Sequence, residues 1–284
     1  MVFGGSAPLV GIITDPPESA ASRDLPTIIL LNQGLVHRAG PNRLHVKIAR
    51  RMASRGFVTL RFDFSGIGDS GISTDTLAFE KRCVKETSEA MDYLRDVRNS
   101  RRFLLLGICL GAVTGFDTAH EDSRVIGVGL INPQQYSQVL TSYVEARRWR
   151  YWKSVLFNPR RWVRPLIGRA DYQSLWIRLR GLFVRKEKAE SAARKVAADF
   201  RALVDRDIDM LLVYSSKDWG LEYMRMVFGD ALPKLIASGK LHLEFVQQAD
   251  HIFTPLPSQQ YLFELIQGWA EGVTSRHSGV RQIG

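Results

Sequence analysis

The chain has 284 residues, of which 45% are hydrophobic and 24% are charged, values that are ordinary for a globular protein with a sizeable core. Its two cysteines, Cys83 and Cys109, are too few for a disulfide framework or a zinc site. No apolar run approaches the roughly 18 residues of a membrane span, and the N-terminus lacks the pattern of a signal peptide. We therefore expect a soluble, cytoplasmic protein.

The formal net charge of +10 is concentrated in one segment. Between Arg147 and Lys188 the chain has 13 lysines and arginines but only two acidic residues, Asp171 and Glu187. Four of the six tryptophans lie in the same segment. The rest of the chain is close to neutral, so the basic charge belongs to one local region.

Strand and helix patterns alternate along the first half of the chain. Short apolar runs predict strands, and apolar residues at helical spacing predict helices. The strands are expected at Leu9–Ile13, Thr27–Asn32, Phe57–Phe62, Phe103–Ile108 and Val125–Ile131, and the helices at Asn42–Arg55, Phe79–Val97 and Leu110–His120.

The alternation stops between Asn132 and Arg194, a stretch that is rich in Trp, Arg and Pro. It resumes with strands at Met210–Tyr214 and Leu241–Val246 and helices at Ala197–Val204, Leu221–Leu235 and Ser258–Gly272, after which the polar tail from Thr274 is expected to fray. The alternation predicts an α/β fold, a mostly parallel sheet with helices on both faces. The interruption predicts a helical cap, residues 134–194, inserted into a core formed by residues 1–133 and 195–284.

The stretch from Gly107 to Gly111 has the pattern G-x-C-x-G between a predicted strand and a predicted helix. It matches the nucleophile elbow G-x-S-x-G, with sulfur in place of the hydroxyl oxygen. Glycines are needed there because larger side chains would collide with the backbone around the strained turn. The turn would expose Cys109 beside a helix N-terminus, whose partial positive charge stabilises a thiolate. The alternative is a buried structural cysteine in an ordinary strand–helix turn.

Two later loops supply partners for such a nucleophile. Asp218 follows the strand Met210–Tyr214, and His251 follows the strand Leu241–Val246. In a parallel sheet, loops that follow the strands gather at one edge, where functional groups meet. The order nucleophile, acid, histidine is that of α/β-hydrolases.

Five motifs in chain order carry a family resemblance. They are LLNQG at Leu30–Gly34, RFDFSGIGDS at Arg61–Ser70, GICLG at 107–111, SSKD at 215–218 and ADH at 249–251. The chain resembles the α/β-hydrolase superfamily and, within it, the serine-aminopeptidase-like branch. It is most similar there to hydrolases associated with bacterial exopolysaccharide and exosortase gene clusters, some of which carry cysteine at the elbow. The resemblance extends from about Thr27 to Trp269, except for the cap.

The resemblance implies an α/β-hydrolase fold and a triad of Cys109 as nucleophile, His251 as base and Asp218 as orienting acid. Asp250 is the second candidate for the acid, although its position next to His251 suits a loop hydrogen bond better. No metal or other cofactor is implied.

The same resemblance implies an oxyanion hole made by two backbone N–H groups, those of Leu110 and Leu35. Many relatives have His-Gly where this chain has Gln33 and Gly34, so both residues are candidates for the substrate pocket. Without the elbow, this stretch would be taken for a plain turn after a buried strand. The loop from Asp63 to Ser70 is expected to be structural, with Asp63 and Asp69 holding loops beneath the site.

Three functions agree with these residues. The first is a hydrolase that cleaves an ester or thioester through an acyl-cysteine intermediate. The second is an acyltransferase or thioesterase that takes its acyl group from an acidic carrier protein or coenzyme A, which a thioester intermediate would suit. The third is a non-catalytic binding protein that keeps a relict pocket.

The composition of the predicted cap affects the choice among these three functions. Its tryptophans Trp149 and Trp152, with Trp219 beside the acid, are candidates for the substrate pocket. Its basic residues form either a solvated face or a surface for an acidic carrier protein, an anionic lipid surface or a polyanionic glycan. Nucleic acid is excluded as a partner because no known nucleic-acid-binding motif accompanies the charge.

Overall fold

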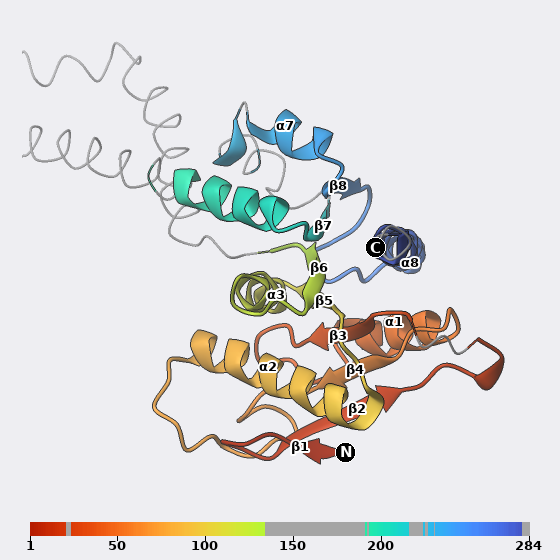
Figure 1. Ribbon diagram of the computed structural model, residues 1–284. Helices are drawn as coiled ribbons and strands as arrows, with labels where there is room; N and C mark the ends of the chain where they lie inside the picture. The colour runs from red at the N-terminus through yellow and green to blue at the C-terminus, as the bar shows by residue number, and fades with distance from the viewer. Residues whose placement is uncertain are drawn as a thin grey trace, which may run out of the picture. The chain divides into compact units, whose positions relative to one another are not determined.

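The computed structural model describes residues 1–20, 24–133, 191, 193–215, 224, 227–229 and 231–279 (Figure 1). The chain divides into two compact units. The first comprises Met1–Gln135, Arg201–Leu221 and Pro233–Gly284, and the second comprises Tyr136–Phe200 and Glu222–Leu232. The cap expected at residues 134–194 lies almost entirely outside the described residues, so its boundaries stay a prediction.

In the described part of the first unit, eight strands form one sheet in the order β1-β2-β4-β3-β5-β6-β7-β8. The strands are β1 Val2–Phe3, β2 Leu9–Thr14, β3 Thr27–Leu31, β4 Thr59–Phe62, β5 Phe103–Ile108, β6 Val125–Ile131, β7 Asp209–Ser215 and β8 Leu241–Val246. The strands from β4 to β8 in this order are parallel, whereas β1 and β2 pair antiparallel. The predicted mostly parallel sheet is confirmed.

Helices cover both faces of this sheet (Figure 1). Helices α1 Leu44–Ala53 and α8 Leu256–Gly279 contact each other on one face, and α2 Phe79–Arg98 and α3 Leu110–Glu121 contact each other on the other. Residues 193–205 form a further helix, and α7 covers Ala231–Ala237. None of the helices in the described ranges is long and apolar enough to cross a membrane.

The arrangement follows from the burial of the strands. All five residues of β3 and all six of β5 are buried, as expected of central parallel strands with helices on both sides. On α1, Leu44, Ile48 and Met52 form the apolar stripe that packs into the core. Because the central strands are buried and paired, their C-terminal ends and the loops that follow keep fixed positions relative to one another.

The C-terminal helix is longer than the sequence analysis predicted. The expectation that the chain frays from Thr274 is wrong, because α8 continues to Gly279. Val273 is fully buried, and the Arg276 Nη2 atom lies 2.6 Å from an oxygen of the buried Asp209. These contacts hold a stretch whose polar composition alone suggested a loose tail.

His45 on α1 makes the stability of the fold depend on pH. Its side chain is 1% exposed, and burial, followed by the nearby charge of Arg61, lowers its pKa to about 4. In the unfolded chain the pKa is near 6.5, so between pH 6.5 and 4 the unfolded state binds more protons and the folded state loses stability. The full difference corresponds to about 3 kcal/mol.

We therefore expect the His45→Leu variant to lose less unfolding free energy than the wild type between pH 7 and 4.5, as measured by urea denaturation. The exposed His37 provides the control, since His37→Gln should keep the wild-type loss. An unchanged loss in His45→Leu would contradict the assignment.

Candidate active site

Cys109 lies on a strained turn between β5 and α3. Its backbone angles are φ 57° and ψ −114°, which non-glycine residues rarely adopt. A Cβ atom added to Gly107 would lie 2.1 Å from the carbonyl group of Gly111, and one added to Gly111 would lie 2.6 Å from the Leu31 oxygen. Both glycines are therefore required by close backbone contacts, as the elbow pattern predicted.

The two cysteines differ in their surroundings. Cys109 is partly exposed, whereas Cys83 is 2% exposed within α2. Burial, assisted by the negative charge of Glu86, raises the pKa of the Cys83 thiol to about 12. Because the thiolate is the reactive form, Cys83 is unsuited to nucleophilic chemistry near neutral pH.

The loop after β3 lies beside the elbow. Gly34 has φ 54°, and a Cβ atom added there would lie 3.3 Å from the Leu110 side chain. Leu35 is 83% exposed and Leu110 is 45% exposed, so neither serves the core. The Leu110 N–H is at the first position of α3, where it has no acceptor within the helix. The two backbone segments expected to form an oxyanion hole are thus neighbours.

The Asp63 carboxylate holds the loop after β3 in place through hydrogen bonds. This fully buried carboxylate accepts hydrogen bonds from the Asn32 Nδ2 atom, at 3.2 Å, and from the backbone and guanidinium of Arg38. Arg38 also forms an ion pair with Asp69. The structural role expected for Asp63 and Asp69 is confirmed, because these contacts fix both ends of the segment that contains Gln33, Gly34 and Leu35.

Asn132, directly after β6, joins three of the loops at this edge of the sheet. Its Nδ2 atom donates to the His251 backbone oxygen at 2.9 Å, and its Oδ1 atom accepts from the Ser215 N–H at 2.7 Å. The neighbouring Ile131 oxygen accepts the Cys109 N–H at 2.9 Å. The backbones of Cys109 and His251 are therefore anchored on two successive residues.

Asn132 was not among the site residues predicted from the sequence. The available signal was a polar residue directly after a buried strand, at the edge where the other candidates gather. Its side chain is buried, with the residue 2% exposed, and its φ of 44° places it in the left-handed region that asparagine tolerates. A buried amide with both ends bonded to backbone is a rigid link between the loops.

The structure describes some of the remaining predicted site residues and leaves others outside its described ranges. Asp250 accepts the Thr254 N–H at 2.8 Å, a loop hydrogen bond of the kind expected for it. Gln33 and Gly34 lie in the loop after β3, and the Gln33 Oε1 atom is buried without a hydrogen-bond partner among the described residues. The other predicted residues lie outside the described residues: Asp218, Trp149, Trp152 and Trp219. Within the described ranges, no group of acidic, histidine or cysteine side chains could hold a metal ion.

Comparisons with known proteins agree with this architecture. No known family model matches the chain. It is 29% identical over 129 residues to the esterase EstD of Thermotoga maritima, a match that covers 44% of this chain and 30% of EstD. It is 27% identical over 126 residues to the protein YcjY of Escherichia coli, covering 44% of this chain and 40% of YcjY. The matched stretches thus span less than half of either relative.

The structural likeness extends over nearly the whole chain. The proline iminopeptidase of Mycobacterium smegmatis superposes with a TM-score of 0.61 at 16% identity, covering 98% of this chain and 99% of that one. At such low identity the likeness establishes the fold and not the activity. The chain therefore has the α/β-hydrolase fold, with distant sequence similarity to EstD and YcjY.

Proposed function

We propose that the protein is a hydrolase that cleaves an ester or thioester through an acyl intermediate on Cys109. The observation that carries the proposal is the strained elbow, which presents a partly exposed cysteine next to the loop that contains Gly34 and Leu35. The distant similarity to an esterase supports an acyl ester as the substrate class.

In the proposed reaction, His251 takes the thiol proton of Cys109 while Asp218 orients its ring. The sulfur attacks the acyl carbonyl carbon, and the negative charge on the carbonyl oxygen is stabilised by the N–H groups of Leu35 and Leu110. The tetrahedral intermediate then collapses, and the leaving alcohol or thiol takes the proton from His251. Water, deprotonated by His251, attacks the resulting thioester and releases the carboxylic acid and the free thiol.

The experiment that tests the proposal is intact-protein mass spectrometry after exposure to a panel of acyl esters and acyl thioesters. The expected result is a single acyl adduct, mapped by peptide digestion to Cys109, together with release of the free acid. An adduct at another residue, or the absence of both adduct and turnover across the panel, would contradict the proposal.

The second candidate is an acyltransferase or thioesterase that takes its acyl group from an acidic carrier protein, and the basic segment from Arg147 to Lys188 favours it because such a carrier could dock there. Adding an alcohol, amine or thiol acceptor to the same experiment distinguishes transfer from hydrolysis, since transfer then yields an acylated acceptor in place of free acid.

We further infer that Asn132 is a positioning residue for this reaction, because it holds the loop of the base relative to the nucleophile. Asn132→Ala is expected to lower kcat by roughly ten- to a hundredfold with little change in KM, since misplacement of a catalytic group affects the chemical step. Asn132→Asp keeps an acceptor for Ser215 but cannot donate to the His251 oxygen, and it should be similarly impaired.

Asn42 supplies a matched control. It also has a positive φ, of 51°, and its Nδ2 atom donates to the Ile252 oxygen, one residue along the same loop, at 3.1 Å. This contact is exposed, so Asn42→Ala should leave kcat close to the wild-type value. Equal losses in the two variants at equal melting temperatures would show that Asn132 has no special role.

A further inference from the structure

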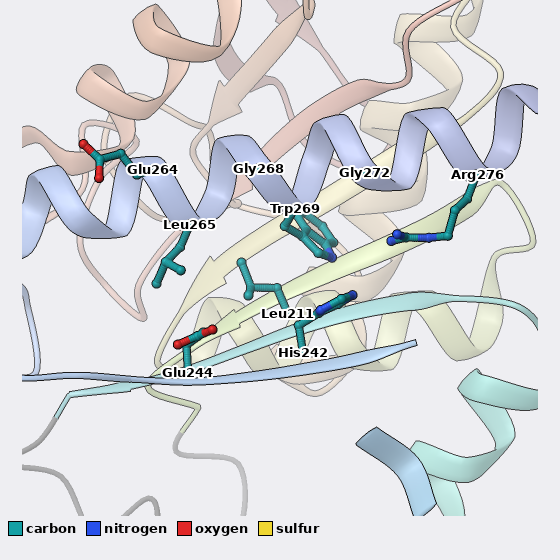
Figure 2. A pocket seen from close by; sticks show the side chains of 9 residues that line it. All are labelled: Leu211, His242, Glu244, Glu264, Leu265, Gly268, Trp269, Gly272 and Arg276. Carbon is teal, nitrogen blue, oxygen red and sulfur yellow. The ribbon is translucent and has the colours of Figure 1, made fainter. Parts of the chain in front are cut away.

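A concave site outside the candidate active site lies between α8 and the last two strands of the sheet. It has a volume of about 350 Å³, within the usual range of small-molecule sites. Figure 2 shows its lining, which comes from β7, β8 and one side of α8: Leu211, His242, Glu244, Glu264, Leu265, Gly268, Trp269, Gly272 and Arg276. None of these residues belongs to the candidate active site.

The hollow exists because α8 has two glycines over it, Gly268 and Gly272. A Cβ atom added to Gly268 would meet nothing within 4 Å, and one added to Gly272 would meet only the Arg276 guanidinium, at 3.4 Å. Glycine is unfavourable inside a helix, and at these positions no close contact requires it. By contrast, Gly127 on β6 is needed for packing, since a Cβ atom there would lie 2.9 Å from the Trp269 ring.

Hydrogen-bond donors gather at one end of this pocket. Trp269 is 6% exposed, and its Nε1 atom is buried without a hydrogen-bond partner among the described residues. In Figure 2 the nitrogen end of its indole is turned toward the His242 ring and the Arg276 guanidinium. One Arg276 nitrogen bonds Asp209, and the other lies beside Gly272. A buried donor without a partner is costly, so an acceptor atom from a ligand would be favoured there.

Carboxylates lie at the other end. Glu244 projects from β8 on the same side as His242, since the two are separated by one residue of the strand. Neither Glu244 nor Glu264 forms an ion pair within the described part of the chain, although Glu264 accepts a hydrogen bond from Gln260. In Figure 2 the Glu264 carboxylate is turned away from Glu244, so Glu244 is the carboxylate at this end that would attract a cation.

From this order of charges we propose that the pocket binds a short peptide with free termini. Its ammonium group would lie at Glu244, and its carboxylate would lie near His242, Arg276 and the Trp269 N–H. Glu264 and Gly272 are eight residues apart along the helix, about 12 Å, which is roughly the length of three extended residues. Apolar side chains of the peptide would contact Leu211, Leu265 and the indole.

The test uses the full-length protein, the tripeptide Gly-Phe-Gly and its N-acetylated form, with affinities measured by titration calorimetry. The wild type should bind the free peptide more tightly than the acetylated one. Gly268→Leu should weaken binding about tenfold or more by filling the pocket, without lowering the melting temperature. Glu271→Leu, which adds the same side chain to the same helix outside the lining, should bind like the wild type.

Glu244→Gln locates the charge contact, because it should weaken binding of the free peptide and leave that of the acetylated peptide unchanged. The free peptide should also fail to compete with an ester substrate, which separates this site from Cys109. The proposal is overturned if the wild type does not bind the peptide at millimolar concentration, or if Gly268→Leu binds it as tightly as the wild type does. These binding measurements stand whether or not the protein hydrolyses esters.

Discussion

Cys109→Ala is expected to lower ester turnover by several orders of magnitude, on the order of 10⁴- to 10⁶-fold, while the protein stays folded. The reason is that alanine has no atom that can attack the acyl carbon, so only transition-state contacts from the rest of the site remain. Steady-state kinetics with an ester, together with the far-UV circular dichroism spectrum, would measure both parts of this prediction.

Two further variants make the result specific. Cys83→Ala should keep full activity, because the Cys83 thiol is buried and its raised pKa keeps it protonated. Iodoacetamide should inactivate the wild type by labelling Cys109 and should leave Cys83 unmodified. Full activity in Cys109→Ala, or preferential labelling of Cys83, would exclude Cys109 as the nucleophile.

His251→Ala is the second change with a large expected effect, a loss in kcat of roughly 10³-fold or more, because the thiol proton then has no acceptor and the leaving group has no donor. The loss should appear in kcat more than in KM, since the role proposed for His251 is in the transition state. The measurement is again steady-state kinetics, with the melting temperature as a check on folding.

The acid that supports His251 can be assigned by comparing two matched variants. Asp218→Asn is expected to be damaging, because an amide cannot stabilise the imidazolium ion as a carboxylate does. Asp250→Asn should be mild, since an asparagine oxygen can still accept the Thr254 N–H. The reverse order of effects would assign the acid to Asp250.

Much of the sheet could be predicted because its central strands are continuous apolar runs. The strands expected at Phe103–Ile108, Val125–Ile131 and Leu241–Val246 agree with β5, β6 and β8 residue for residue. The antiparallel β1 was missed, since its two residues carry no pattern and depend on pairing with β2. The end of α8 was misjudged because the ion pair that holds it joins residues 67 positions apart.

In the candidate site, too, some features follow from the local sequence and others depend on contacts between distant residues. The elbow could be predicted from local spacing, because its two glycines and Cys109 form a fixed pattern along the chain, even though the contact that excludes a side chain at Gly111 comes from Leu31 on β3. Asn132 could not, since its partners Ser215 and His251 are 83 and 119 positions away and become neighbours only when β6, β7 and β8 pair. The pocket beneath α8 also depends on packing between distant elements.

At the elbow, the position of the side chain at residue 109 and the chemical identity of its terminal atom are determined separately. The backbone contacts of Gly107 and Gly111 dictate where the side chain at position 109 stands, and none of them involves its terminal atom. Oxygen could therefore replace sulfur there without rebuilding the turn. A cysteine and a serine could be exchanged at this position on an unaltered scaffold, and the one substitution Cys109→Ser would make that exchange in the laboratory.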